Sequence, residues 1–517
     1  MKKQTTEILI IGTGLAGSIA ALTVADLGKK VTIITKTKTP NSGNTQYAQG
    51  GIVYSGINDS SIKLRNDIIK AGANHCSDLA VDQISKLGPK LVKELLIDKY
   101  DITFQKIKSK LDLTIEAAHS EPRILHNKDK TGHSIQGKLT QQLKAHPNIT
   151  LLMDHMAVDI LTLSHHSLNS KDIYKKPACF GAMILNNKTN DIFPIYANKT
   201  ILSTGGLAQL FLHSTNPKES TGDGVAMAWR SGARCFNMQY VQFHPTALFH
   251  ESGRFLISEA LRGEGAKLID HKGHEFMKNF HKDGSLAPRD IVSRGIHKTM
   301  LKNNKQCVYL DVSHKPDQWI IKRFPTIFST CNKKGFDITK DPIPVVPAAH
   351  YSCGGIGVNL SGRTSLQRLY AIGEVSCTGV HGANRLASTS LLESLVWGYT
   401  SGQDAAKLSK SDKYFPDIEL WKKANSYVDP AFISQSWITI KNTMWNYVGL
   451  VRTRSRLLRA QSVLKQLQSN IDSFYQKSKI NKEILELRNG IQAANAITAA
   501  AIEARESRGT HYIEPQE

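Results

Sequence analysis

The chain has 517 residues, more than one compact core usually holds, so two or three domains are expected. Hydrophobic residues make up 40% of the chain and charged residues 21%, which is typical of a folded globular protein and argues against disorder. The net charge of +22 suits RNA, anionic lipid or an anionic small molecule equally well.

The basic residues are spread along the chain and form one modest cluster. Its members, Arg452, Arg454, Arg456 and Arg459, are expected on a helix, where a solvated basic face is the simplest interpretation. Charge alone therefore selects no partner.

Hydropathy and cysteine usage indicate an ordinary cytoplasmic protein. No window approaches the roughly 18 consecutive apolar residues of a spanning helix. The apolar stretch at residues 8–11 is shorter than the core of a secretory signal, and a glycine turn follows it. The seven cysteines are scattered and never spaced Cys-x-x-Cys, so reduced thiols are expected rather than a disulfide framework or a metal site.

The chain opens with the pattern of a βαβ unit. Residues 7–11 predict a buried strand, residues 12–17 a glycine turn, and an Ala/Leu-rich helix follows to about Leu27. A second strand is predicted from Val31 to Thr35. This opening indicates a nucleotide-binding α/β domain.

The rest of the chain contains both predicted helices and predicted strands. Residues 62–100 predict helices, and residues 237–345 show a mixed pattern with few long helices. Residues 366–405 predict a second nucleotide-fold segment, with a strand, a glycine-rich loop and a helix from about Ser390. From about residue 415 the pattern is helical and ends in an Ala-rich helix at 491–506. Strands are also predicted within residues 150–205, at Leu151–Met153, Met183–Leu185 and Thr200–Leu202, with a polar loop at 164–177.

A G-x-G-x-x-G loop joins the first strand to the first helix. In such a loop the first glycine permits the tight turn, the second lets the backbone approach a pyrophosphate, and the third lets helix and strand pack closely. The motif consists of Gly12, Thr13, Gly14, Leu15, Ala16 and Gly17. In this strand–turn–helix context it predicts dinucleotide binding.

The end of the second strand departs from the dinucleotide pattern. An acid is expected there to hold the ribose hydroxyls, yet the chain has Lys36 after Thr35. A lysine at this position hints at the phosphate of NADP, so the first motif leaves the cofactor open.

The second nucleotide-fold segment favours FAD. The strand at Leu369–Ile372 ends in Gly373 and Glu374, a pattern similar to the late flavin signature in which an acid lies beside the ribityl chain. Ser390 and Leu391 begin a helix whose positive N-terminal end would lie near the flavin pyrimidine and stabilise an anionic reduced ring.

Between the two flavin segments lie short runs rich in arginine, histidine and hydroxyl groups. A substrate with two carboxylates suits such a set, because guanidinium forks bind carboxylates bidentately and histidines donate directional hydrogen bonds. The runs are Gln242–Thr246, Ser258–Gly265, Ala287–Asp290, Ala349–Tyr351 and Gly382–Leu386.

Six family-like runs, in this order, resemble the succinate dehydrogenase/fumarate reductase flavoprotein family: Gln242–Thr246, Glu259–Gly265, Pro288–Asp290, His350–Gly355, Ala371–Glu374 and His381–Glu393. The resemblance covers nearly the whole chain and includes Ala48–Gly51 and Thr221–Gly224. Three further runs, at 116–120, 123–126 and 506–512, are similar to the members of that family that oxidise L-aspartate.

The resemblance implies an α/β fold, with a Rossmann-like FAD-binding domain, an inserted α+β capping domain and a helical C-terminal domain. The implied boundaries are residues 1–236 and 346–408 for the two parts of the FAD-binding domain, 237–345 for the capping domain and 409–517 for the helical domain.

The resemblance also implies substrate-binding residues. His244, Ser258, His350 and Arg385 would hold the substrate carboxylates, with Gln242 nearby. The family usually has threonine at the position of Ser258, and the hydroxyl is kept.

Further implied roles concern proton transfer and the substrate amine. Arg289 would face the reacting carbons and carry a proton, with Glu259 and Arg262 as a relay. Such a role is unusual for arginine, whose solution pKa lies above about 12. Glu116 would lie near the substrate ammonium group and so distinguish aspartate from succinate.

The implied cofactor is non-covalent FAD. Family members that attach flavin covalently do so through a histidine four residues before Ala48, a position that Asn44 occupies here. Besides the glycine loop, the implied FAD-binding residues are Lys36, Asn44, Thr45, Gln46, Tyr47, Ala48, Gln49, Gly50, Gly51, Asp223, Glu374, Ser390 and Leu391.

The resemblance therefore implies FAD-dependent oxidation of L-aspartate to iminoaspartate, the first step of de novo NAD synthesis, with dioxygen or fumarate as electron acceptor. Quinolinate synthase is the implied next enzyme, and no nucleic acid or membrane partner is expected. One alternative is the flavoprotein subunit of a membrane succinate or fumarate complex, which Asn44 disfavours. A second is an RNA-binding flavoprotein, which would leave the arginine and histidine set unexplained.

Overall fold

The computed structural model describes residues 4–116, 118–408, 414–419, 421 and 428–515. Ala117, within one of the family-like runs, and part of the predicted C-terminal region lie outside the described residues. Among the described residues, no helix is long and apolar enough to cross a lipid bilayer.

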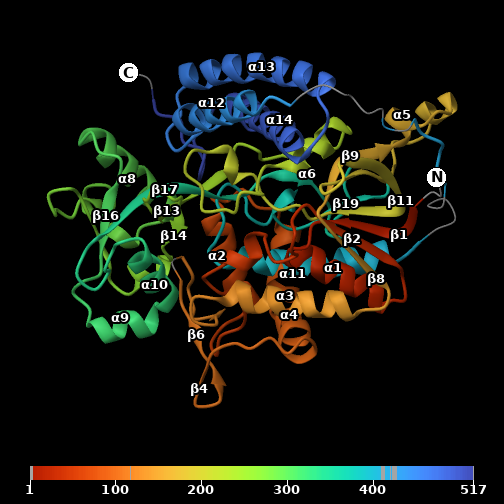
Figure 1. Cartoon of the computed structure of the whole chain (residues 1–517). Coiled ribbons are helices and arrows are strands. Elements are labelled where there is room, and N and C mark those ends of the chain that lie inside the picture. Colours follow the sequence, from red (N-terminus) through yellow and green to blue (C-terminus); the bar gives the residue numbers. More distant parts are fainter. Residues whose placement is uncertain (1–3, 117, 409–413, 420, 422–427, 516–517) are drawn as a thin grey trace.

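The main sheet of the protein has seven strands in the order β8-β2-β1-β11-β10-β9, with β19 also paired to β11 (Figure 1). β1 pairs in parallel with β2 and β11, whereas β9, β10 and β11 pair antiparallel. The strands are β1 Gln4–Ile11, β2 Val31–Thr35, β8 Ile149–Met153, β9 His155–Thr162, β10 Cys179–Asn186, β11 Asp191–Leu202 and β19 Leu369–Ala371. The βαβ opening and the strands predicted within residues 150–205 and 366–405 are confirmed.

Helices between residues 15 and 405 pack around this sheet and its neighbouring loops. They are α1 Leu15–Asp26, α2 Ser61–Ala71, α3 Asp78–Leu91, α4 Thr131–Ala145, α5 Leu163–His166, α6 Asp223–Arg230 and α11 Thr389–Ala405. α1 and α11 pack closely, since a Cβ at Gly398 would lie 2.8 Å from the Ala16 carbonyl oxygen. The two nucleotide-fold segments are therefore one structural unit. The predicted helical region 62–100 is confirmed, with a break at 72–77 and a π-helix, Val92–Lys99, at its end.

Short elements connect these layers. The strands are β3 Ile52–Val53, β4 Lys106–Ile107, β5 Lys110–Leu111, β6 Leu113–Thr114, β7 Ile124–Leu125, β12 Cys235–Phe236, β18 Gly355–Gly357 and β20 Ser376–Cys377. The 3-10 turns beside the site are Asn44–Tyr47 and Gly373–Val375. The predicted polar loop 164–177 contains part of α5 and a 3-10 turn, Ser170–Tyr174.

The capping region forms a second, five-stranded sheet in the order β14-β13-β17-β16-β15. Its own apolar core is drawn from residues between Leu248 and Val346. Its elements are β13 Val241–Leu248, β14 Phe255–Leu256, α7 Glu259–Gly263, β15 Lys267–Ile269, α8 Arg289–Lys302, β16 Val308–Asp311, α9 Asp317–Arg323, α10 Pro325–Lys333 and β17 Ile343–Ser352. The domain boundaries remain predictions, and the one at 345/346 falls inside β17.

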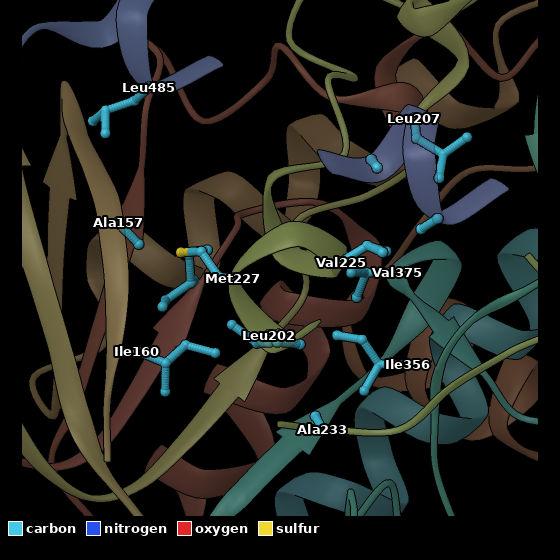
Figure 2. Packing of buried hydrophobic residues seen from close by; sticks show 14 of the residues in the cluster. Ala157, Ile160, Leu202, Leu207, Val225, Met227, Ala233, Ile356, Val375 and Leu485 are labelled. Carbon is cyan, nitrogen blue, oxygen red and sulfur yellow. The ribbon is translucent and has the colours of Figure 1, made fainter. Parts of the chain in front are cut away.

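In the part of the C-terminal region that the structure describes, the helices are α12 Pro430–Val448, α13 Arg454–Lys477 and α14 Lys482–Glu503. They lie along one side of the main-sheet region (Figure 1, blue). Leu485 of α14 belongs to the same buried cluster as Ala157 and Met227 (Figure 2). The C-terminal region thus shares a core with the nucleotide-binding sheet.

The prediction of a solvated basic face is wrong for Arg452. This residue precedes α13 and is fully buried. Its guanidinium donates hydrogen bonds to the carbonyls of Val448 and Gln239 and contacts His511. Burial lowers the pKa of Arg452 to about 10. Arg452 therefore joins chain segments inside the protein.

Candidate functional site

An open cavity connects the glycine loop to the capping region, and its volume of about 1770 Å³ includes space open to solvent. It is lined by backbone and small side chains near the glycine loop and by charged side chains near the capping region. Of the residues predicted for the site, all but Gly17, Gln46, Gln242 and Arg262 line this cavity.

The glycine loop has the geometry that a bound pyrophosphate requires. Gly12 has φ +114°, and a Cβ there would lie 2.1 Å from the Ser203 carbonyl oxygen. A Cβ at Gly17 would lie 2.1 Å from the Gly12 carbonyl oxygen, so Gly17 serves helix packing rather than the cavity wall. At Gly14 the nearest atom would be Thr45 Oγ1, at 3.4 Å. This leaves the loop backbone accessible to phosphate oxygens, and the site fits a dinucleotide.

Asn44 and Glu374 bring the two flavin segments together. Asn44 donates hydrogen bonds to Glu374 Oε2 at 2.7 Å and to Asn216 Oδ1 at 2.9 Å. Burial raises the pKa of Glu374 to about 7. Gln46, in contrast, does not line the cavity, because its amide contacts His133.

Lys36 does not present a free charge to a cofactor phosphate. Its Nζ lies 2.6 Å from Asp223 Oδ2 and 2.7 Å from Glu486 Oε1. Because two carboxylates already neutralise the ammonium group, the hint of NADP from the sequence is not supported. Lys36 and Asp223 both line the cavity where the ribose of a dinucleotide is expected.

At the opposite end of the cavity, Arg385 lies over the ring of Tyr351, with Cζ 4.6 Å from the ring centroid. Among the described residues no carboxylate pairs with it, and its buried Nε has no hydrogen-bond partner. Burial and the neighbouring Arg289 lower its pKa. A buried guanidinium in this state attracts a carboxylate ligand.

His244 and His350 lie beside Arg385 with ring centroids 5.3 Å apart. Burial and the surrounding arginines hold the pKa of both rings well below the ordinary value, so both are neutral. The Thr246 backbone N–H donates to His244 Nδ1, which assigns the proton of that neutral ring to Nε2.

A chain of three charged side chains leads away from the cavity. Arg289 Nη2 and Nε both lie 2.5 Å from Glu259 Oε2, and Arg262 Nη2 lies 3.2 Å from Glu259 Oε1. Burial raises the pKa of Glu259, but the two arginines outweigh it and hold the pKa below its ordinary value. Arg262 then donates to the Ser285 carbonyl at 2.7 Å. Arg262 thus lies behind Glu259 rather than in the cavity wall.

Gln242 supports Arg385 from behind the cavity wall. Its amide donates to the Arg385 carbonyl at 2.8 Å and to Asn384 Oδ1 at 2.7 Å. Ser258 caps α7 by accepting from the Ala260 N–H at 3.3 Å, which leaves its own hydroxyl proton available to the cavity.

Glu116 lies at the cavity between the glycine-rich segment and α11. Its Oε2 accepts a hydrogen bond from Ser388 Oγ at 2.6 Å. Ser388 precedes α11 with φ +56°, in the left-handed region that is uncommon for serine. This strained turn points the Ser388 hydroxyl toward Glu116.

Ser388 and Tyr351 were not predicted as site residues. Both lie inside the family-like runs, next to predicted residues, which is the only signal that could have identified them. The contact of Ser388 with Glu116 joins residues 272 positions apart, and Tyr351 meets Arg385 only through tertiary packing, so neither contact is visible from local pattern.

Comparisons with known proteins agree with this geometry. A family model described as an FAD binding domain matches residues 7–391, and one described as the fumarate reductase flavoprotein C-terminus matches residues 438–515. L-Aspartate oxidase 1 of Ralstonia nicotianae is 41% identical, over 98% of this chain and 94% of its own length. L-Aspartate oxidase of Yersinia pestis is 42% identical, over 99% of this chain and 96% of its own.

A solved structure of E. coli quinol fumarate reductase superposes with a TM-score of 0.88 at 25% identity, covering 100% of this chain and 92% of that one. The matched family models, the full-length relatives and the superposed structure agree, and the chain belongs to the L-aspartate oxidases of the succinate dehydrogenase/fumarate reductase flavoprotein family.

Proposed function

We propose that the chain oxidises L-aspartate to iminoaspartate. The substrate loses a hydride from its α carbon and a proton from its amine, and dioxygen or fumarate takes up the electron pair, giving hydrogen peroxide or succinate. Bound FAD supplies the hydride acceptor.

The main evidence for this proposal is the balance of charges at the capping end of the cavity. Arg262, Arg289 and Arg385 carry three positive charges, and Glu259, which contacts Arg262 and Arg289, carries one negative charge. Two positive charges therefore remain for two substrate carboxylates. Glu116 adds one negative charge at the same cavity, which matches the ammonium group that aspartate has and succinate lacks.

The neighbouring groups would hold the substrate in one orientation. Arg385 would pair with one carboxylate, and neutral His244 and His350 would each donate an N–H to carboxylate oxygens. Ser258 would donate its hydroxyl. Buried, preformed donors of this kind bind more tightly than exposed ones because they do not exchange with water.

Arg289 would serve the proton transfer of fumarate reduction, giving a proton to the substrate carbon. Its 2.5 Å contact with Glu259 supports this role, because a short charged contact lets the carboxylate return a proton to the guanidinium. Arg262 would pass the next proton to Glu259.

A succinate- or fumarate-oxidoreductase subunit is the second candidate, and the fold likeness to quinol fumarate reductase favours it. Asn44 and Glu116 speak against it, since the first cannot attach flavin covalently and the second suits an amine. We further propose that the protein works in the cytoplasm in NAD synthesis and that quinolinate synthase consumes its product.

A steady-state assay tests the proposed activity. The FAD-loaded protein is mixed with L-aspartate, D-aspartate, L-glutamate or succinate, and hydrogen peroxide is measured. The proposal expects turnover with L-aspartate well above the other three. Faster turnover of succinate would favour the second candidate.

A further inference from the structure

The ribose end of the cavity is built partly by the C-terminal helix α14. In dinucleotide folds the ribose hydroxyls bind an acid at the end of the second strand. Here that position is Lys36, and the acid comes instead from Asp223 at the start of α6. Side chains of helix α14 contact both Lys36 and Asp223.

Two side chains of α14, one turn apart, make these contacts. Glu486 Oε1 lies 2.7 Å from Lys36 Nζ, and Asn489 Nδ2 donates to Asp223 Oδ1 at 3.0 Å. Asp223 therefore has one oxygen bound to Lys36 and the other bound to Asn489 and to the Thr221 hydroxyl. Its orientation is set by three separate segments of the chain.

The cluster is buried, and its carboxylates are paired with ammonium groups. Burial lowers the pKa of Lys36, but Asp223 and Glu486 more than offset it, so the ammonium stays charged. Glu486 Oε1 also lies 3.8 Å from Lys482 Nζ, so two carboxylates face two ammonium groups, and Asp223 is the carboxylate that lines the cavity. Such a group accepts hydrogen bonds from ribose hydroxyls, as the missing strand-end acid would.

Helix α14 also packs through apolar side chains in the core that adjoins the cavity. Leu485 belongs to the buried cluster that includes Ala157 and Met227 (Figure 2), and these two residues, like Lys36, line the cavity. Asn489 is fully buried and also accepts from Arg230 at 2.9 Å. The position of α14 relative to the cavity is therefore fixed by packing as well as by charge.

We propose that α14 completes the adenosine-ribose end of the FAD site, with Glu486 and Asn489 as positioning residues that hold Lys36 and Asp223 for the cofactor. Neither residue lines the cavity, so their effect passes through the two residues they hold. This inference rests on FAD as the cofactor and is independent of which dicarboxylate is oxidised.

FAD binding to the FAD-free protein tests it. Quenching of flavin fluorescence gives the dissociation constant, at a temperature where each variant is folded. Glu486→Gln removes one charge from Lys36. Asn489→Asp keeps the shape and the contact with Arg230 but removes the donor to Asp223. We expect each to weaken FAD binding about ten-fold, the size expected for loss of a buried charge-assisted bond. Glu483→Gln, on the exposed face of the same helix, should change the dissociation constant less than about two-fold.

A second experiment distinguishes a loss of Lys36 positioning from a general destabilisation of the protein. In a Lys36→Met background, Glu486→Gln should add no further loss of FAD affinity, because its partner is gone. Unchanged FAD affinity in both α14 variants overturns the proposal. So does a full ten-fold loss that persists without Lys36. If Glu486→Gln fails to fold, the same decision rests on Asn489→Asp, whose FAD affinity must fall.

Discussion

The two ends of the cavity offer different groups for binding anions. Around the pyrophosphate position the wall is backbone, shaped by Gly12 and Gly14 and by the N-terminus of α1. At the capping end the wall is made of charged side chains, including the buried Arg385 and the largely buried Arg289. The first end offers many weak dipoles, and the second offers a few full charges with little solvent.

This difference decides how each end responds to change. Backbone donors cannot be removed by a side-chain substitution, so the pyrophosphate position should tolerate most single changes that avoid its glycines, unlike the ribose end that Glu486 and Asn489 support. A buried guanidinium has no substitute nearby, so each change at the capping end should remove a large part of the binding or the rate.

The largest effect is expected for Arg289→Gln. Loss of a group that transfers a proton typically lowers kcat by about a hundred- to ten-thousand-fold. Fumarate reduction measured with reduced viologen should show this loss while FAD content stays normal. Arg294→Gln, on the same helix α8 but outside the cavity, serves as control. Activity near wild type in Arg289→Gln would remove this residue from the chemistry.

Arg385→Leu should lose affinity for dicarboxylates and keep the flavin. Leaving a buried carboxylate without its partner costs about 2–5 kcal/mol, or roughly thirty-fold or more in affinity. Arg385→Lys should recover only part of this, because a lysine lacks the planar fork. Succinate titration monitored by the flavin spectrum measures both, and an unchanged dissociation constant would contradict the assignment.

Glu116→Gln should separate aspartate from substrates without an amine. A charge-assisted bond to the ammonium group contributes about 1.5–3 kcal/mol, or roughly ten- to a hundred-fold. Aspartate oxidation should fall by this factor while fumarate reduction stays near wild type. Glu121→Gln, in the same loop and paired with Lys63, is the control. An equal loss of both activities would indicate a structural role.

The neutral histidines predict a pH dependence of stability. The pKa of His244 is far below its unfolded value near 6.5, so the unfolded chain binds the proton first as pH falls. Stability from this group is complete above about pH 6.5 and decreases below it, by about 1.4 kcal/mol per pH unit. Denaturant unfolding of wild type and His244→Asn at pH 7 and pH 5 should show a smaller loss in the variant. Equal losses would mean that His244 is charged in the folded protein.

The last prediction concerns how the flavin is attached to the protein and involves no substitution. Because Asn44 stands where related enzymes have the attaching histidine, acid precipitation should leave all of the yellow colour in the supernatant. Colour that remains with the protein pellet would show a covalent bond at another residue.

The sequence predicted the cofactor end well, because a strand, a glycine turn and a helix are set by local interactions. Through resemblance to a known family, it also predicted that His244, Arg289, His350 and Arg385 reach the cavity, whereas Arg262 lies behind Glu259. Local pattern did not show that Arg452 is buried, since its partners Gln239 and His511 are far away in the chain. The roles of Glu486 and Asn489 were equally hidden, because only the packing of α14 brings them to Lys36.

The most direct test of the account is anaerobic mixing of the FAD-loaded protein with L-aspartate or succinate, followed by flavin absorbance near the visible maximum. The account predicts rapid bleaching by L-aspartate and much slower bleaching by succinate, with the difference reduced in Glu116→Gln. Bleaching by succinate as fast as by L-aspartate would contradict it.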